Sequence, residues 1–226
     1  MKVLITVAAV MFTTGALGQQ CQCITDSSLS EAVTCYTVRF SNHAKLYRQF
    51  NCDSSWLTFE SSRGTKTILY SLDDGLIGYT EKLGYQYATE YKATFLVQNN
   101  LISGCCTPPE YLLFNKSTGK VIKNLGRLIF YSEDVKFPLV VYIEDTVFSR
   151  LKFYDVNTGR LFYVPLPPHT IKNTLEKGAE RYAEYLFEDA EISGNHFSVS
   201  FRYQNPGNND DWMDYKLSVD LKKYGY

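Results

Sequence analysis

Six cysteines are the residues whose chemistry is easiest to assign in this sequence. They are Cys21, Cys23, Cys35, Cys52, Cys105 and Cys106. Their C-x-C and C-C spacings lack the paired C-x-x-C of zinc ribbons and thioredoxin-like sites, and no histidine stands at a metal-binding spacing from them. An even set of cysteines in an oxidising compartment is typical of disulfides. We therefore expect a disulfide framework and no metal ligands.

One pairing can be argued from strand geometry. Residues 34–40 and 46–51 predict two strands around a short turn. In a hairpin centred just after His43, Cys35 faces Cys52 at a position where side chains come close, so we predict that bridge. The remaining bridges would join Cys21 and Cys23 to Cys105 and Cys106, with a ring between adjacent Cys105 and Cys106 as the alternative.

Carboxylates are the next candidates for chemistry. The adjacent pairs Glu144-Asp145 and Glu188-Asp189 could serve as acid and base, but neighbours along a strand point to opposite faces. The acidic segment 208–214 offers oxygen ligands without the spacing of an EF-hand loop, and a solvated hairpin tip explains it better. No nucleophile elbow, P-loop or H-E-x-x-H motif is present. The sequence predicts no catalytic, cofactor-binding or metal-ligating residue.

Tyrosine is unusually frequent, with 18 among 226 residues. Many lie in predicted strands, where an aromatic ring with a polar tip suits a half-buried face. On an exposed face, tyrosines would instead suit recognition of a protein or a carbohydrate. Tyr79, Tyr85, Tyr87 and Tyr91 crowd one segment and are the candidates for such a patch.

The first residues predict an export signal. Lys2 precedes an apolar run at 3–12, and Ala16 and Gly18 place small residues at a cleavage position. We expect a signal peptide at 1–18, a single β-rich domain at 19–226, and a soluble protein that is secreted or periplasmic. The chain carries 23 basic and 24 acidic residues without a block of one sign, so we expect no nucleic-acid partner. No later apolar run has transmembrane length.

Hairpins dominate the rest of the chain. Strand–turn–strand patterns are expected at 56–70, 111–122, 151–163 and 197–221. The glycines Gly64, Gly119 and Gly159 mark three of the turns, at spacings of 55 and 40 residues. This spacing over residues 50–165 resembles the blade repeat of β-propellers, which implies a small propeller-like array.

An antiparallel sandwich or barrel explains the same hairpins through ordinary turn chemistry, and we prefer it of the two. One helix is expected at 174–189, because Leu175, Ala179, Tyr182 and Leu186 recur at helical spacing.

The sequence therefore predicts a mainly β protein with structural disulfides and no cofactor. The function it favours is an exported binding or interaction protein of unknown target and unknown oligomeric state. An exported hydrolase using paired carboxylates is one alternative, and a periplasmic inhibitor or immunity-type protein is another.

Overall fold

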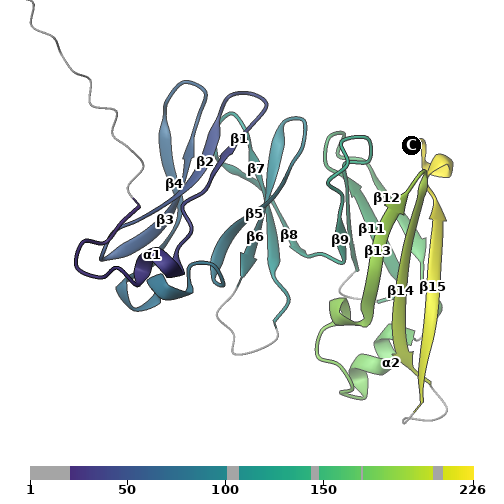
Figure 1. Cartoon of the computed structure of the whole chain (residues 1–226). Helices are drawn as coiled ribbons and strands as arrows, with labels where there is room; N and C mark the ends of the chain where they lie inside the picture. The colour runs from purple at the N-terminus through teal and green to yellow at the C-terminus, as the bar shows by residue number, and fades with distance from the viewer. Residues whose placement is uncertain (1–20, 101–106, 144–147, 169, 206–210) are drawn as a thin grey trace, which may run out of the picture.

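The computed structural model describes residues 21–100, 107–143, 148–168, 170–205 and 211–226. Strands form four antiparallel sheets, and each sheet is a meander of strands consecutive in the chain. The sheets follow one another along the molecule in sequence order (Figure 1). The prediction of a mainly β protein is confirmed.

Each sheet takes its strands from one stretch of chain. Sheet 1 consists of β1 (Thr37–Arg39), β2 (Lys45–Phe50), β3 (Ser54–Glu60) and β4 (Lys66–Asp73). Sheet 2 consists of β5 (Gly84–Glu90), β6 (Thr94–Asn100), β7 (Glu110–Asn115) and β8 (Val121–Arg127). Sheet 3 consists of β9 (Phe130–Tyr131), β10 (Leu139–Ile143), β11 (Arg150–Asp155) and β12 (Leu161–Pro165). Sheet 4 consists of β13 (Phe187–Ser193), β14 (His196–Gln204) and β15 (Trp212–Asp220).

Short helices connect or flank the sheets. They are α1 (Leu29–Ala32), η1 (Asp74–Tyr79), α2 (Thr170–Glu176), η2 (Ala183–Leu186) and η3 (Leu221–Tyr224). Among the described residues, no helix is long and apolar enough to cross a membrane.

The sheets pack face to face, and apolar side chains fill each space between neighbours. In β6, Phe95 and Val97 pack toward sheet 1 while Leu96 packs toward sheet 3, and all three are fully buried. A strand buried on both faces reads as a continuous apolar run, because neither face meets water. A further core joins sheets 3 and 4, where Phe153 packs edge-on against Phe197.

The two end sheets turn polar faces outward. On β2 of sheet 1, Lys45 points away from the core and pairs with Glu60 at 3.2 Å. On β14 of sheet 4, Ser198, Ser200 and Arg202 alternate with the buried residues. Polar outer faces are how repeat arrays end in water.

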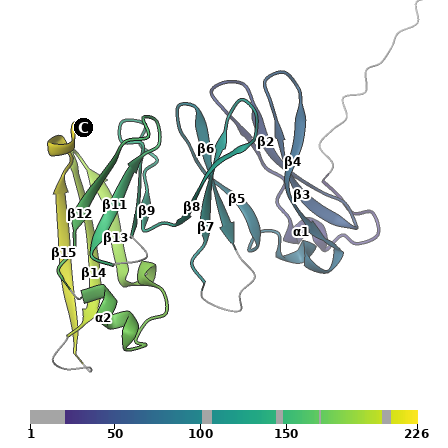
Figure 2. The same ribbon diagram turned by 180° about the vertical axis from the view of Figure 1, so that it is seen from behind.

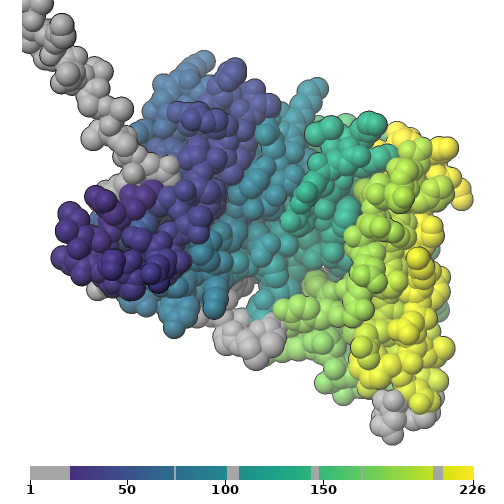
Figure 3. Space-filling model, in the orientation of Figure 1, coloured from purple at the N-terminus to yellow at the C-terminus, as the bar shows by residue number. Residues whose placement is uncertain are grey.

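The array does not close into a ring. Sheets 1 and 4 lie at its opposite ends (Figures 1 and 2), and no core cluster of described residues joins them. Figure 3 shows the sheets as adjacent bands from purple to yellow. The expected antiparallel hairpins are confirmed, and over the described residues the sheets form no closed barrel.

The predicted helix at 174–189 is also wrong in its extent. Helix α2 ends at Glu176, and Gly178 follows with φ +71°, a left-handed conformation that stops a helix. Beyond it, Leu186 ends η2 and Phe187 begins β13, and both pack into the core of sheets 3 and 4. Ala179 and Tyr182 lie between α2 and η2, so the residues at helical spacing do not form one continuous helix.

Two disulfides hold the segment before β1. Cys21 bonds to Cys35, and Cys23 bonds to Cys52. Cys21 also forms a parallel bridge with Phe50, which lays the N-terminal segment beside the end of β2. The predicted Cys35–Cys52 bridge is therefore wrong, and Cys21 and Cys23 are not joined to Cys105 and Cys106, which lie outside the described residues.

The error in pairing comes from the turn between β1 and β2. His43 takes φ +68°, and the amide of Phe40 bonds the carbonyl of Ala44, so the turn is centred on Asn42. The observed register then pairs Thr37 with Tyr47, which puts Cys35 three residues out of step with Cys52.

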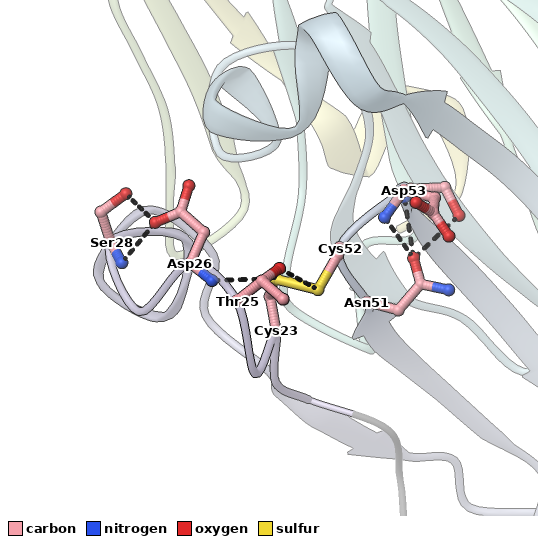
Figure 4. Close-up of a disulfide and its surroundings, with 8 residues drawn as sticks. Cys23, Thr25, Asp26, Ser28, Asn51, Cys52 and Asp53 are labelled. Atoms are coloured by element: carbon pink, nitrogen blue, oxygen red, sulfur yellow. Dashed lines mark hydrogen bonds between the residues drawn. A yellow bond between two sulfur atoms is a disulfide. The ribbon is translucent and has the colours of Figure 1, made fainter.

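Local hydrogen bonds brace the Cys23–Cys52 bridge (Figure 4). The Thr25 hydroxyl lies 3.2 Å from each of the two sulfurs, and the Asp26 amide donates to Cys23 Sγ. In the next turn, Asn51 Oδ1 accepts from the amides of Asp53 and Ser54, which closes the loop between β2 and β3.

Candidate functional site

Hairpin turns from three sheets meet on one side of the array, called here the turn side (top in Figure 1). The turns after β7 and β11 are built alike. Asn115 Oδ1 accepts from the amides of Ser117 and Thr118, and Asp155 Oδ1 accepts from the amides two and three residues beyond it. The repeated sequence pattern therefore corresponds to one turn structure, in which a side chain caps the turn and a glycine with positive φ follows.

A cavity of about 500 Å³, the turn-side pocket, opens among the turns after β1, β5 and β11. Its volume lies in the range of small-molecule sites. Its lining is Ser41, Tyr87, Thr89, Glu90, Tyr91, Lys92, Glu133, Val135 and Asn157. Residues from sheets 1, 2 and 3 therefore contribute to one pocket, which only the stacking of the sheets brings together.

A buried ion pair fixes one wall of the pocket. Lys116 Nζ lies 2.5 Å from Glu90 Oε1 and donates to Ser41 Oγ at 2.9 Å. Ser41 in turn donates to Glu90 through both its amide and its hydroxyl. Burial acts to raise the pKa of Glu90, but the hydrogen bonds from Lys116 and Ser41 outweigh it and hold that pKa below its ordinary value.

Backbone and amide contacts tie the same turns together. Asn42 Nδ2 donates to the carbonyl of Lys116, which connects sheet 1 to sheet 2. The Lys92 amide donates to Asn157 Oδ1, which connects sheet 2 to sheet 3. The pocket walls are thus positioned by specific bonds between neighbouring sheets.

Tyr91 supplies a buried polar group. Its side chain is 4% exposed and packs with Leu96 and Val140 between sheets 2 and 3, yet no described residue hydrogen-bonds its hydroxyl. Burial, and then Tyr131, Glu133 and Tyr87, raise the pKa of this hydroxyl. Tyr91 also lines the turn-side pocket.

Tyr87 shares that environment. Burial, followed by the charges of Glu90 and Glu133, raises its pKa to about 12. Both hydroxyls therefore stay protonated and neutral at physiological pH. A neutral tyrosine hydroxyl donates one hydrogen bond and accepts others.

The four tyrosines predicted as a recognition patch are divided by the structure. Tyr79 is exposed at the end of η1, whereas Tyr85 stacks on Tyr70 at 4.9 Å in the core between sheets 1 and 2. Only Tyr87 and Tyr91 line the pocket, and Tyr91 is buried in the core. The four do not form a single exposed surface.

The other residues singled out in the sequence lie away from the pocket or outside the described residues. Glu188 and Asp189 are exposed at a bulge in β13, where Asp189 takes φ +54°. Glu144, Asp145 and residues 206–210 lie outside the described residues, as do residues 1–20 with the predicted signal peptide. The described residues bring no three His, Cys, Asp or Glu side chains into a metal-binding group.

Sequence reasoning missed the charged residues that line the pocket, Glu90, Lys92 and Glu133, and also Lys116, which pairs with Glu90. Glu90 ends β5, Lys116 lies in the turn after β7 and Glu133 lies between β9 and β10, so no local motif connects them. The signal that could have raised interest in Lys116 was its place in the repeated turn, where the second copy carries the apolar Val156.

The chain matches no protein-family model, and the search of curated proteins finds no similar sequence.

Proposed function

We propose that this chain is an exported binding protein and that its ligand enters the turn-side pocket. The observation that carries the proposal is that Tyr91, which lines that pocket, has a buried hydroxyl without a hydrogen-bond partner among the described residues. A buried polar group without a partner costs about 1–3 kcal/mol, and a ligand group that bonds it recovers that cost. Export is proposed from the sequence of residues 1–18 and is supported by the two disulfides.

The protonation state of the carboxyl groups favours a binding function over hydrolysis. A hydrolase with paired carboxylates needs one acid whose pKa is raised, so that it holds a proton to donate. Among the described carboxyl groups, those with a shifted pKa are Asp26, Glu60 and Glu90, and all three are shifted downward. Glu90 is moreover held by Lys116, which leaves it ionised.

An inhibitor or immunity-type protein would be expected to gather its exposed apolar side chains into one contact surface. Here they are spread over the last strands of four sheets, with Ile68 on β4, Ile122 on β8, Leu161 on β12 and Met213 on β15. This distribution favours a pocket ligand over a broad protein interface.

The experiment compares small molecules that co-purify with the full chain and with Glu133→Gln after exposure to its native medium, using mass spectrometry. We expect a compound enriched by the wild type and depleted in the variant. Identical profiles for the two proteins, or turnover of a substrate in a broad hydrolase panel, would overturn the proposal.

A further inference from the structure

We propose that the turn-side pocket binds a neutral, polyhydroxylated ligand, which is to say a saccharide. The inference rests on the proposed binding function and adds the chemical class of the ligand. The groups that line the pocket support this class through their hydrogen-bonding capacity and their charges.

The polar groups at the pocket are hydroxyls, the carboxylate of Glu133, the amide of Asn157 and the ammonium group of Lys92, besides the paired Glu90. Within the described part of the chain, the hydroxyls of Tyr87 and Tyr91 make no hydrogen bond, and the carboxylate of Glu133 makes neither a hydrogen bond nor an ion pair. Asn157 Oδ1 is occupied by the Lys92 amide, so Nδ2 of Asn157 remains as a donor.

This combination matches the hydroxyl groups of a sugar. Each sugar hydroxyl can accept a hydrogen bond from a tyrosine hydroxyl and can donate one to a neighbouring oxygen. It can therefore pair with a tyrosine hydroxyl as donor or as acceptor, and it can also donate to a carboxylate. Hydrogen bonds to a charged carboxylate are the stronger ones, so Glu133 is expected to fix the orientation of the ligand. Tyrosine rings also give a large contact area at low entropy cost.

Charged ligands fit less well. An ammonium group only donates, so it would bond Glu133 but leave the tyrosine hydrogens without acceptors. An anionic ligand would accept from the tyrosines and could meet the ammonium group of Lys92, but it would also lie beside the carboxylate of Glu133. Lys92 offsets the charge of Glu133, and Lys116 offsets that of Glu90, so a ligand without net charge best suits the balance of charges at the pocket.

Isothermal titration of the full chain tests the inference. The probes are neutral trisaccharides of the malto-, cello-, xylo- and manno- series, with choline as the cationic probe and glucuronate as the anionic probe. The variants are Tyr91→Phe and Glu133→Gln, and the matched control is Tyr79→Phe, which removes an exposed tyrosine hydroxyl outside the pocket. Melting temperatures confirm that each variant is folded.

We expect at least one neutral trisaccharide to bind, with an affinity about tenfold weaker in Tyr91→Phe and in Glu133→Gln, since a lost hydrogen bond of about 1.4 kcal/mol corresponds to tenfold. The control should bind as the wild type does. Binding of choline or glucuronate alone would overturn the saccharide class while leaving the binding function standing. Saccharide binding unchanged in both variants would overturn the site, and no binding by any probe would overturn both proposals.

Discussion

Lys116 and Glu90 form an ion pair of 2.5 Å in which the lysine side chain is only 3% exposed. The Ser41 hydroxyl accepts a hydrogen bond from Lys116 Nζ and donates one to Glu90 Oε1. The pair therefore joins sheet 2 to the first turn of sheet 1. At the other end of the same interface, the buried Arg48 of β2 donates to the carbonyl of Tyr85 and to Gln86 on β5. Two buried cations thus join sheets 1 and 2.

Removing the carboxylate should destabilise the protein. Glu90→Gln leaves the Lys116 ammonium buried without its counter-ion, and we expect a loss of about 2–4 kcal/mol in the free energy of unfolding. Urea denaturation at pH 7 measures it. The matched control is Glu133→Gln, a pocket glutamate without an ion pair, which should change stability by no more than about 0.5 kcal/mol. Equal effects of the two substitutions would contradict a stabilising role for the Lys116–Glu90 pair.

The same pair predicts a pH dependence. The pKa of Glu90 in the folded protein lies below the ordinary value of 4.5, so the unfolded chain binds the proton more readily. The stabilisation is therefore complete above pH 4.5 and is lost as the pH falls through the lowered folded pKa. We expect the stability difference between wild type and Glu90→Gln to shrink between pH 5 and pH 3. A constant difference over that window would exclude this linkage.

A glycine pair tests the packing of sheet 2 on sheet 1. Gly119 and Gly159 occupy the same place in the two repeated turns, with φ of +67° and +75°. A methyl group on Gly119 would overlap the Phe59 ring, whereas one on Gly159 would meet nothing within 4 Å. We expect Gly159→Ala to cost about 1 kcal/mol from backbone strain, and Gly119→Ala about 2–4 kcal/mol because overpacking is added. Thermal denaturation of the two variants measures both losses of stability. Equal losses would contradict the close approach of Gly119 to the Phe59 ring.

The disulfide assignment can be tested by thiol labelling. Cys21→Ala should leave Cys35 reactive, and Cys23→Ala should leave Cys52 reactive, with no crossover between the two. Removing both cysteines of the Cys23–Cys52 bridge, which closes a 29-residue separation, should lower stability by about 3–4 kcal/mol on the loop-entropy account. Labelling of Cys52 in the Cys21→Ala variant would contradict the observed connectivity.

The hairpins were predictable from sequence because their turns carry local signals. Gly119 and Gly159, each placed after a polar residue that caps the turn, located two of them. The face-to-face stacking was not predictable, since burial on both faces of β6 shows only as a run of apolar residues. That run does not reveal which sheet lies on either side.

The errors have equally local causes. His43 takes a left-handed φ, and the first hairpin is centred on Asn42 and not just after His43 as predicted. Cys35 therefore does not face Cys52. The sequence drew attention to Tyr87 and Tyr91 by residue type, as members of an exposed patch and not of a pocket. Glu133 and Asn157 join them only through contacts between sheets, which the sequence does not show.

Amide chemical-shift mapping with the tightest-binding neutral trisaccharide tests the central claim most directly. We expect the largest shifts on Tyr87, residues 89–92, Glu133 and Asn157, which line the turn-side pocket. Shifts confined to the outward polar faces of sheet 1 or sheet 4, with the pocket residues unchanged, would contradict it.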